Sequence, residues 1–299
     1  MKILITGASG LVGTHLTPLL LEKGYTVAHL GRGTGNNPQV KHFRWDPENG
    51  ELDTAATEWA DLVVNLAGAP VADKRWTDAR KKTIINSRVK GLRLMADAIK
   101  KQVKKPVALI SASAVGIYGI TTSEKIYSET DLPAADFFGD CCRQWETAAD
   151  LFEEMHIRTV KLRIGVVLAK EGGALPKLAG PVKWGIGSPL GSGKQWIPWI
   201  HTDDLCAMFV KAIEDESLAG VYNAVGSQHT TNRAFVKAIG KTLKRPVFMP
   251  PVPAFALKLL LGEMAGIVTE GSRISNEKIR KTGFHFQYEK LEDALKDLL

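Results

Sequence analysis

The sequence predicts an α/β fold built on a doubly wound parallel sheet, with a smaller C-terminal domain added to it. Three observations predict this class. Apolar strand-like runs alternate with helical stretches from the first residues onward, as in chains whose parallel strands are joined by crossover helices. A glycine-rich turn separates the first strand from the first helix. Past Gly165 the alternation gives way to a segment rich in glycine and proline, which is typical of an irregular connection.

The opening of the chain reads as strand, turn, helix and strand. The apolar run 2–6 predicts a strand, residues 7–13 a turn, and the leucines that follow a helix that ends at Gly24. Residues 25–30 predict a second buried strand. A strand–helix–strand unit of about 30 residues is the βαβ pattern of a parallel sheet.

Further elements continue the alternation toward the C-terminus. Strands are predicted at 62–66, 107–111, 159–164 and 220–223, and helices around 80–100, 140–155 and 202–214. Residues 171–198 are rich in glycine and proline and predict an irregular, functional loop region. Residues 225–299 predict helices separated by proline-rich breaks.

Composition and charge narrow the class of protein. Hydrophobic residues make up 44% of the chain and charged residues 24%, as in soluble globular proteins. The net charge of +7 comes from scattered Lys and Arg without a recognition motif, so we expect no nucleic-acid partner. No apolar run approaches the ~20 residues of a membrane span, so we expect no membrane partner. Cys141, Cys142 and Cys206 offer neither a disulfide framework nor zinc-ligand spacing, which favours a reducing cytoplasm and no metal site.

The turn that follows the first strand has the glycine spacing of a dinucleotide site. Glycine is needed where the backbone turns sharply, approaches a pyrophosphate or packs a helix against a strand. The free N–H groups at the start of the next helix then bind the phosphates. The predicted contacts of this Rossmann-type turn are Gly7, Ser9, Gly10, Leu11, Val12 and Gly13. The alternative is a tight turn that binds no ligand.

The end of the second strand predicts which dinucleotide binds. An acidic residue there accepts from the ribose hydroxyls of NAD, whereas an arginine accommodates the 2′-phosphate of NADP. The strand ends His29-Leu30-Gly31-Arg32, without a carboxylate. Because a guanidinium forms charge-assisted bonds with phosphate, Arg32 predicts NADP; the alternative is an exposed loop arginine.

Two other strand ends belong with this site. Leu66, Ala67 and Gly68 are small enough to let the backbone approach adenine and ribose, and the hydroxyls of Ser111 and Ser113 would face the nicotinamide. Ligands of open α/β sheets bind at the carboxyl ends of the strands. We therefore predict that residues 1–167 and about 198–224 form the dinucleotide-binding domain. Residues from about 168 to 197 and 225–299 then form a smaller substrate-side domain.

A set of longer motifs extends over the whole chain. They are Asn65-Leu66-Ala67-Gly68, Arg75-Trp76, Ser87-Arg88, the segment from Ser111 to Gly119, Trp145-Glu146, the segment from Arg163 to Leu168, and Gly191-Ser192-Gly193-Lys194-Gln195-Trp196-Ile197-Pro198-Trp199-Ile200-His201. With the glycine turn, they resemble the atypical extended short-chain dehydrogenases/reductases, in the branch of the epimerase family proteins, once described as similar to a cell-division inhibitor. The last fifty or so residues resemble the small C-terminal domain of that branch.

The resemblance adds residues to the predicted sites. It implies that Arg75, Arg88, Ile164 and Gly165 contact the cofactor. On the substrate side it points to Trp196, Trp199 and His201, where clustered aromatic rings suit a planar or sugar-like molecule. Surface ion pairs for the arginines, and packing between the domains for the rings, are the alternatives.

The resemblance fails at the catalytic residues. The superfamily uses a tyrosine, with a lysine four residues later, to exchange a proton with the substrate. None of the five tyrosines has this lysine, and alignment of the helix on Glu146 places Phe138 and Cys142 at those two positions. Ser113 matches the serine of the superfamily, and Tyr118 offers a phenol nearby, so we predict these two as catalytic candidates. A reactive thiol at Cys142 is the less favoured option because no partner would form its thiolate.

Two functions follow from this pattern. The first is an NADP-dependent oxidoreductase, reductase-like or epimerase-like, that acts on a nucleotide sugar or carbonyl compound; Ser113, Tyr118 or a bound water would handle the proton. The second is a non-catalytic NADPH-binding regulatory or sensor protein. The sequence leaves open whether the chain is an enzyme, what its substrate is, and whether it is a monomer or a homodimer.

Overall fold

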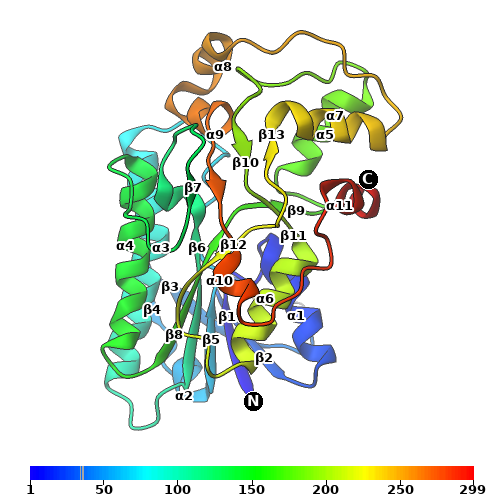
Figure 1. Cartoon of the computed structure of the whole chain (residues 1–299). Helices are drawn as coiled ribbons and strands as arrows, with labels where there is room; N and C mark the ends of the chain where they lie inside the picture. Colours follow the sequence, from blue (N-terminus) through cyan, green and yellow to red (C-terminus); the bar gives the residue numbers. More distant parts are fainter. Residues whose placement is uncertain (34, 36) are drawn as a thin grey trace.

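A computed structural model describes residues 1–33, 35 and 37–299. Its described part is built around an eight-stranded sheet with the strand order β12-β8-β6-β5-β1-β2-β3-β4 (Figure 1). The strands are β1 (Lys2–Thr6), β2 (Thr26–Gly31), β3 (Lys41–Asp46), β4 (Glu51–Leu52), β5 (Leu62–Asn65), β6 (Ala108–Ala114), β8 (Arg158–Ile164) and β12 (Gly220–Ala224). All neighbours run parallel except β3 and β4. The predicted α/β class with a doubly wound parallel sheet is confirmed.

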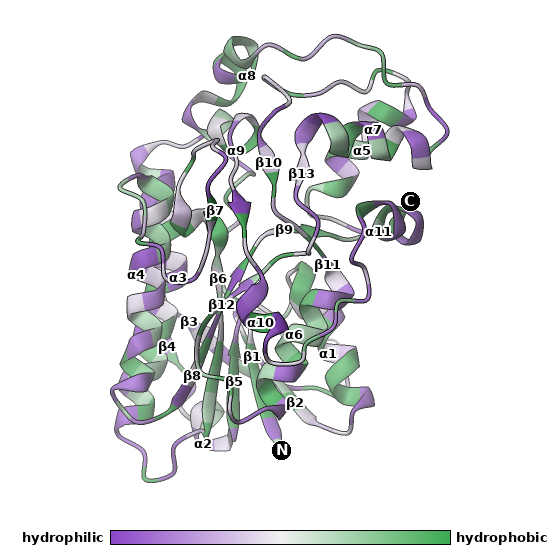
Figure 2. Cartoon of the chain, viewed as in Figure 1, coloured by the Kyte–Doolittle hydropathy of each residue, from purple (hydrophilic) through white to green (hydrophobic). Residues whose placement is uncertain are grey.

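Helices cover both faces of this sheet, as crossover connections require. On one face lie α1 (Leu11–Glu22) and α6 (Thr202–Glu214), and on the other α3 (Asp78–Lys100) and α4 (Phe137–Glu153), with the short α2 (Ala55–Trp59) beside α3 (Figure 1). The strands are apolar along most of their length (Figure 2), because both of their faces are buried.

A second unit covers the carboxyl edge of the sheet, the upper part of Figure 1. It holds β9 (Val166–Leu168), α5 (Leu175–Lys183), β10 (Trp196–Ile197), β11 (Trp199–His201), β13 (Thr230–Thr231), α7 (Asn232–Thr242), α8 (Ala254–Leu261), η2 (Gly262–Ala265), α9 (Gly266–Thr269) and α11 (Leu291–Leu298). Leu168 and Trp199 share a separate hydrophobic core with Phe235 and Leu295. Segments that precede β12 in the chain and segments that follow it therefore build this core together.

The remaining short elements connect the two units. They are η1 (Val115–Tyr118), β7 (Ile126–Tyr127), β14 (Arg273–Ile274) and α10 (Glu277–Arg280). β14 pairs with β7 in parallel. In the part of the chain that the structure describes, no helix is both long and apolar enough to span a bilayer.

One prediction about an element was wrong, and one strand was not predicted. Residues 171–198 were expected to be irregular, but α5 lies within them, with Pro176 in its first turn, where no N–H is needed, and Pro181 inside it. Its apolar residues are buried in the second core, and this burial outweighs the proline. The sequence analysis also missed β3, whose Phe43 and Trp45 alternate with polar residues.

Candidate cofactor and active site

The glycine turn is shaped by two close backbone approaches. Gly7 has φ +68°, and a Cβ there would lie 2.6 Å from the carbonyl carbon of Leu66. A Cβ on Gly13 would lie 2.5 Å from the Cα of Ala8, so α1 can only begin this close to β1 because residue 13 is a glycine. Gly10 precedes the helix without a side-chain cap. The first N–H groups of α1 therefore remain available for an anion.

A chain of buried hydrogen bonds ties three strand ends together beside this turn. The hydroxyl of Thr6 donates to Asn65 Oδ1 at 2.7 Å, and the amide of Asn65 donates to Ser111 Oγ at 3.1 Å. All three residues are at most 1% exposed. Ser111 therefore helps to tie β6 to β5 and β1, and its own proton is donated to the carbonyl of Ala112 at 3.0 Å. The sequence had predicted that this hydroxyl faces the nicotinamide, whereas it lies inside the buried chain of hydrogen bonds.

The strand order places the two halves of a dinucleotide. β1 lies between β2 and β5, and the chain order reverses there, which is the switch point where dinucleotides bind. Arg32 is exposed and directly follows β2, while Leu66, Ala67 and Gly68 directly follow β5. These residues fit a dinucleotide that lies across the ends of β2, β1 and β5, with its adenosine over the β2 side and its nicotinamide toward β6. A nicotinamide bound there would supply hydride transfer.

The two catalytic candidates lie in one buried polar network. Ser113 Oγ donates to Glu146 Oε1 at 2.6 Å, and Glu146 accepts from both Nε and Nη2 of Arg163 at 2.8 Å. Nη1 of Arg163 donates to the hydroxyl of Tyr118 at 3.0 Å, and that hydroxyl donates to Asn223 Oδ1 at 2.7 Å. Ser113 and Tyr118 are each 2% exposed. Both hydroxyl protons are thus held by protein acceptors.

Electrostatics in the network favour a structural role for Tyr118. Burial raises the pKa of Tyr118 to about 12, although Arg163 and Asn223 act in the opposite direction. Burial alone would lower the pKa of Arg163, but the hydrogen bonds and charge of Glu146 raise it overall. The guanidinium of Arg163 therefore stays charged and the phenol of Tyr118 stays protonated across the physiological range.

Helix α4 carries the residues that stand in place of the tyrosine and lysine. Phe138 packs edge-on against Trp76 with ring centroids 4.8 Å apart. Cys142 is 3% exposed, and burial raises the pKa of its thiol far above the usual value. Neither side chain can exchange a proton at neutral pH, which agrees with the loss of the usual dyad.

The two arginines implied by the resemblance lie in different places. Arg88, on α3, reaches the segment after β5, where its Nη1 donates to the carbonyl of Ala69 at 3.1 Å. Arg75 is exposed and lies beside Gly262, where a Cβ would stand 3.2 Å from its Nη2. Arg75 therefore lies beside η2 of the upper unit, whereas Arg88 lies beside the segment that follows β5.

The residues predicted to face the substrate lie in the second core or beside it. Trp199 is 1% exposed and its indole donates to the carbonyl of Gln228 at 3.2 Å. His201 is equally buried, stacks on Tyr288 with ring centroids 3.7 Å apart, and lies 3.3 Å from Asp297 of α11. These two residues hold the C-terminal segment in place. Trp196 is half-buried under the guanidinium of Arg273.

Ile164 is the last residue of β8, and Gly165 follows it where the chain leaves the sheet. The N–H of Gly165 donates to the carbonyl of Ala224 at 3.1 Å. A Cβ on Gly165 would stand 2.1 Å from the carbonyl oxygen of Pro198. The glycine therefore allows two connecting segments to meet closely at the carboxyl edge.

Glu146 and Arg163 stand within motifs whose sequence predicted no role for them, and no sequence signal pointed to Asn223. A signal for this pair was present in the sequence: an arginine in a predicted buried strand and a glutamate in a predicted helix, each within a motif. Their pairing joins residues 17 apart in sequence, and no spacing rule for a helix or a strand predicts it.

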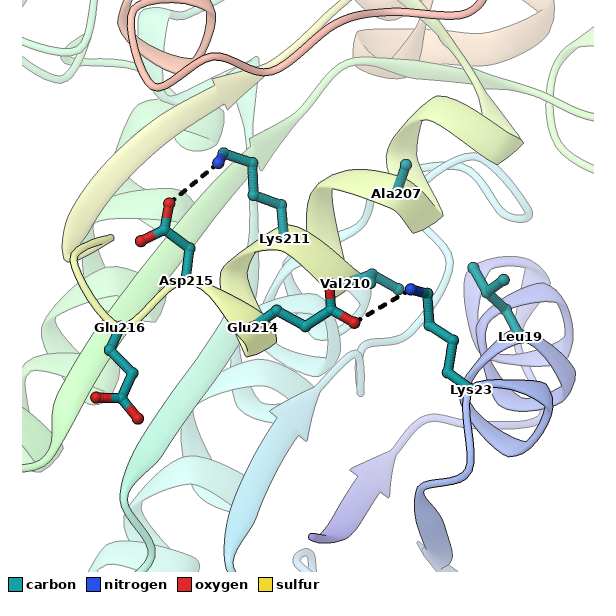
Figure 3. A pocket seen from close by; sticks show the side chains of 8 residues that line it. All are labelled: Leu19, Lys23, Ala207, Val210, Lys211, Glu214, Asp215 and Glu216. Atoms are coloured by element: carbon teal, nitrogen blue, oxygen red, sulfur yellow. Dashed lines mark hydrogen bonds and ion pairs between the residues drawn. The ribbon is translucent and has the colours of Figure 1, made fainter.

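A shallow groove lies far from this edge, between the ends of α1 and α6 (Figure 3). Its walls carry the ion pairs Lys23–Glu214 at 3.1 Å and Lys211–Asp215 at 3.0 Å. Lys23 follows the C-terminus of α1, and the phosphate-binding N–H groups lie at the other end of that helix. The groove therefore plays no part in the candidate site.

Comparison with known proteins agrees with this geometry. Residues 3–224 match the NAD dependent epimerase/dehydratase family, and residues 252–298 match a domain of unknown function, DUF1731. Epimerase family protein YfhF of Bacillus subtilis strain 168 is 37% identical over 302 residues, which span 100% of this chain and 98% of YfhF. Epimerase family protein SDR39U1 of Mus musculus is 33% identical, with 100% of both chains covered.

Solved structures extend the comparison. Human epimerase family protein SDR39U1 (isoform 2), crystallised with NADPH, superposes with a TM-score of 0.88 at 31% identity, covering 100% of this chain and 99% of that chain. UDP-glucuronic acid 4-epimerase of Bacillus cereus, solved with UDP-glucuronic acid and NAD, has a TM-score of 0.81 at 20% identity over 100% and 98% of the two chains, a likeness of fold. The chain therefore belongs to the NAD dependent epimerase/dehydratase family, within the group of the epimerase family proteins, as its motifs predicted.

Proposed function

We propose that this protein binds NADP(H) at the carboxyl edge of its sheet and acts as a reductase-like or epimerase-like oxidoreductase. The observation that carries the NADP assignment is Arg32, which directly follows β2 where NAD-binding folds place a carboxylate. The NADPH in human SDR39U1 supports the same choice. The substrate is a carbonyl compound or a nucleotide sugar.

Proton transfer in this proposal falls to Ser113 or to a bound water. Ser113 ends β6 on the nicotinamide side of the switch point. Its proton is held by Glu146, so Ser113 can serve a substrate only if that bond is exchanged for one to the substrate oxygen. Tyr118 is assigned instead to the buried network, because its hydroxyl is already shared between Asn223 and Arg163.

Cofactor titration tests the binding step. Wild-type protein should bind NADPH at least tenfold more tightly than NADH, a difference of about 1.4 kcal/mol. Gly10→Val should abolish binding of both while the protein stays folded, because its branched side chain points where the pyrophosphate must approach. Equal affinities for the two cofactors would overturn the NADP assignment, and retained binding by a folded Gly10→Val protein would place the ligand elsewhere.

A second candidate function is an NADPH-binding sensor that regulates a partner. The observation in its favour is that the protons of Ser113 and Tyr118 are both committed to buried acceptors. Screening carbonyl compounds and nucleotide sugars for NADPH oxidation separates the two candidates. Tight NADPH binding without turnover on any of them would favour the sensor.

A further inference from the structure

Large apolar side chains project from the upper end of the molecule. Helix α8 is apolar at every position except Lys258, yet none of its residues is buried (Figure 2). Phe255 and Leu259, four residues apart and therefore on one face of the helix, are 76% and 81% exposed. Trp184, which follows α5, is 85% exposed. Single exposed apolar residues are ordinary, whereas a group of neighbouring ones marks a surface that binds another molecule.

The backbone brings these side chains to one end of the molecule. The N–H of Val252, two residues before α8, donates to the carbonyl of Pro189 at 2.9 Å, and the N–H of Gly191 donates to the carbonyl of Val252 at 2.9 Å. The loops 184–194 and 244–253 therefore lie side by side across the top of Figure 1. We call these two loops and α8 the upper surface. Its large exposed apolar residues are Trp184, Ile186, Phe248, Met249, Phe255, Leu259 and Leu260.

The segments that build this surface carry only positive charge. Residues 172–202 and 217–262 contain nine Lys and Arg and no Asp or Glu. The chain as a whole has 39 Lys and Arg and 32 Asp and Glu, so carboxylates outnumber cations outside these segments. All nine cations are exposed, and none of them is in an ion pair within the described part of the chain. They are Lys177, Lys183, Lys194, Arg233, Lys237, Lys241, Lys244, Arg245 and Lys258.

Charge and shape together indicate what binds there. A second copy of the chain would place the same surface against itself across a two-fold axis, and the like charges of the two copies would repel each other. The apolar side chains project into water instead of lining a hollow, which suits the soft surface of a bilayer. Exposed Trp, Phe and Leu side chains next to Lys are typical of segments that lie in the head-group region of a membrane.

We propose that the upper surface binds the surface of an anionic lipid bilayer. Trp184, Phe255 and Leu259 enter the head-group region, and the neighbouring Lys183 and Lys258 contact lipid phosphates. The expectation of no membrane partner rests on the lack of a run that spans a bilayer, whereas binding at its surface needs no such run. The proposal does not depend on the cofactor.

Sedimentation of the whole protein with vesicles tests the apolar contribution. Wild type at low salt should bind vesicles of phosphatidylcholine and phosphatidylserine in equal parts at least roughly tenfold more tightly than vesicles of phosphatidylcholine alone, because only the first are anionic. Phe255→Ser combined with Leu259→Ser should weaken this binding at least roughly tenfold. The matched control is Val103→Ser combined with Leu132→Ser, which changes two apolar residues that are at least as exposed but lie outside the upper surface. It should bind like wild type.

A second pair of variants tests the charge. Lys183→Gln combined with Lys258→Gln should weaken binding to the anionic vesicles at low salt, and the difference from wild type should disappear at high salt, because salt screens exposed charges. Lys101→Gln combined with Lys105→Gln removes two exposed lysines outside the basic segments. This control should bind the vesicles like wild type at both salt concentrations.

Trp184 reports insertion directly, because the other tryptophans are buried or half-buried. The tryptophan emission should shift to shorter wavelength on the anionic vesicles, and Trp184→Phe should remove the shift. No binding of wild type to these vesicles at low salt would overturn the proposal and leave an acidic protein as the partner of this surface. Equal binding to both kinds of vesicle, an emission that does not shift, or unchanged binding of the Phe255 and Leu259 variant would also overturn it. So would a large drop in the unfolding temperature of that variant, which would show that these side chains serve the fold.

Discussion

Two arginines at the carboxyl edge of the sheet differ in the groups that they bind. Arg163, on β8, is bound through two nitrogens to Glu146, while Arg88, on α3, is bound to backbone carbonyls and lies over the ring of Trp145. Glu146 and Trp145 are adjacent residues of α4. The two cations thus approach the same turn of one helix, and one of them meets a carboxylate there.

The difference lies in what each guanidinium does for the fold. The ion pair of Arg163 and Glu146 also engages Ser113 and Tyr118, so these two hydroxyls are used to stabilise the protein. Arg88 has no carboxylate within ion-pair distance among the described residues. Both arginines stand in motifs of the family, and only the structure shows that their partners differ.

The largest effect on stability is expected at Arg163. Arg163→Met removes two of the three hydrogen bonds that the buried Glu146 carboxylate accepts and leaves it without its cation. Breaking a buried pair in this way costs about 3–5 kcal/mol, measured as a fall in the free energy of unfolding in urea. Arg93→Met, which changes an exposed arginine of α3, is the control, with no expected loss. A loss below about 1 kcal/mol for Arg163→Met would show that the pair behaves like a surface ion pair.

Ser113→Ala should have a smaller effect on the same network. It removes one hydrogen bond to an ionised acceptor, worth about 1.5–3 kcal/mol, while Glu146 keeps Arg163. In the Arg163→Met background the loss should differ from that in wild type, because both residues act on one carboxylate. Strictly additive losses would contradict the network. If the serine also serves a substrate, turnover falls by about 10²–10⁴-fold.

Arg32→Ala tests an arginine that is exposed instead of buried. We expect it to remove most of the NADPH preference, about 1.4 kcal/mol or tenfold, because the 2′-phosphate loses its charge-assisted partner. Titration with both cofactors measures the change, and NADH affinity serves as the internal control. A preference that survives the substitution would assign the 2′-phosphate to another residue.

The smallest effect is expected at Cys142, whose thiol is influenced by both Arg88 and Arg163. Burial raises its pKa despite these two charges, so the thiol stays protonated. Cys142→Ser should leave NADPH affinity within twofold of wild type, and iodoacetamide at pH 8 should not alkylate Cys142 in the native protein. Rapid alkylation, detected by mass spectrometry, would instead reveal a thiolate and reopen thiol chemistry.

The sequence predicted the sheet and the cofactor turn because their signals are local. Apolar runs and a glycine-spaced turn depend on neighbouring residues, and the observed α6 (Thr202–Glu214) even begins and ends as predicted. The short α5 was missed because tertiary burial overrides its prolines.

The catalytic candidates were harder to predict because their partners are distant in sequence. Ser113 bonds to a residue 33 positions away, and Tyr118 to one 105 positions away. The type of residue suggested proton chemistry, whereas the partners decide whether a proton is available. The first bond depends on the packing of α4 on β6, and the second joins η1 to β12. A motif encodes neither arrangement.

The second core has a consequence for how the protein is made. Leu168 and Trp199 leave the ribosome well before their partners Phe235 and Leu295, which lie on α7 and α11. The nascent chain must therefore carry exposed apolar side chains until its last helix has been synthesised. A stop codon near residue 250 would not release a smaller working nucleotide-binding protein. It would release a chain whose second core lacks the apolar residues of α11 and is exposed to water. Chaperones and proteases act on such chains.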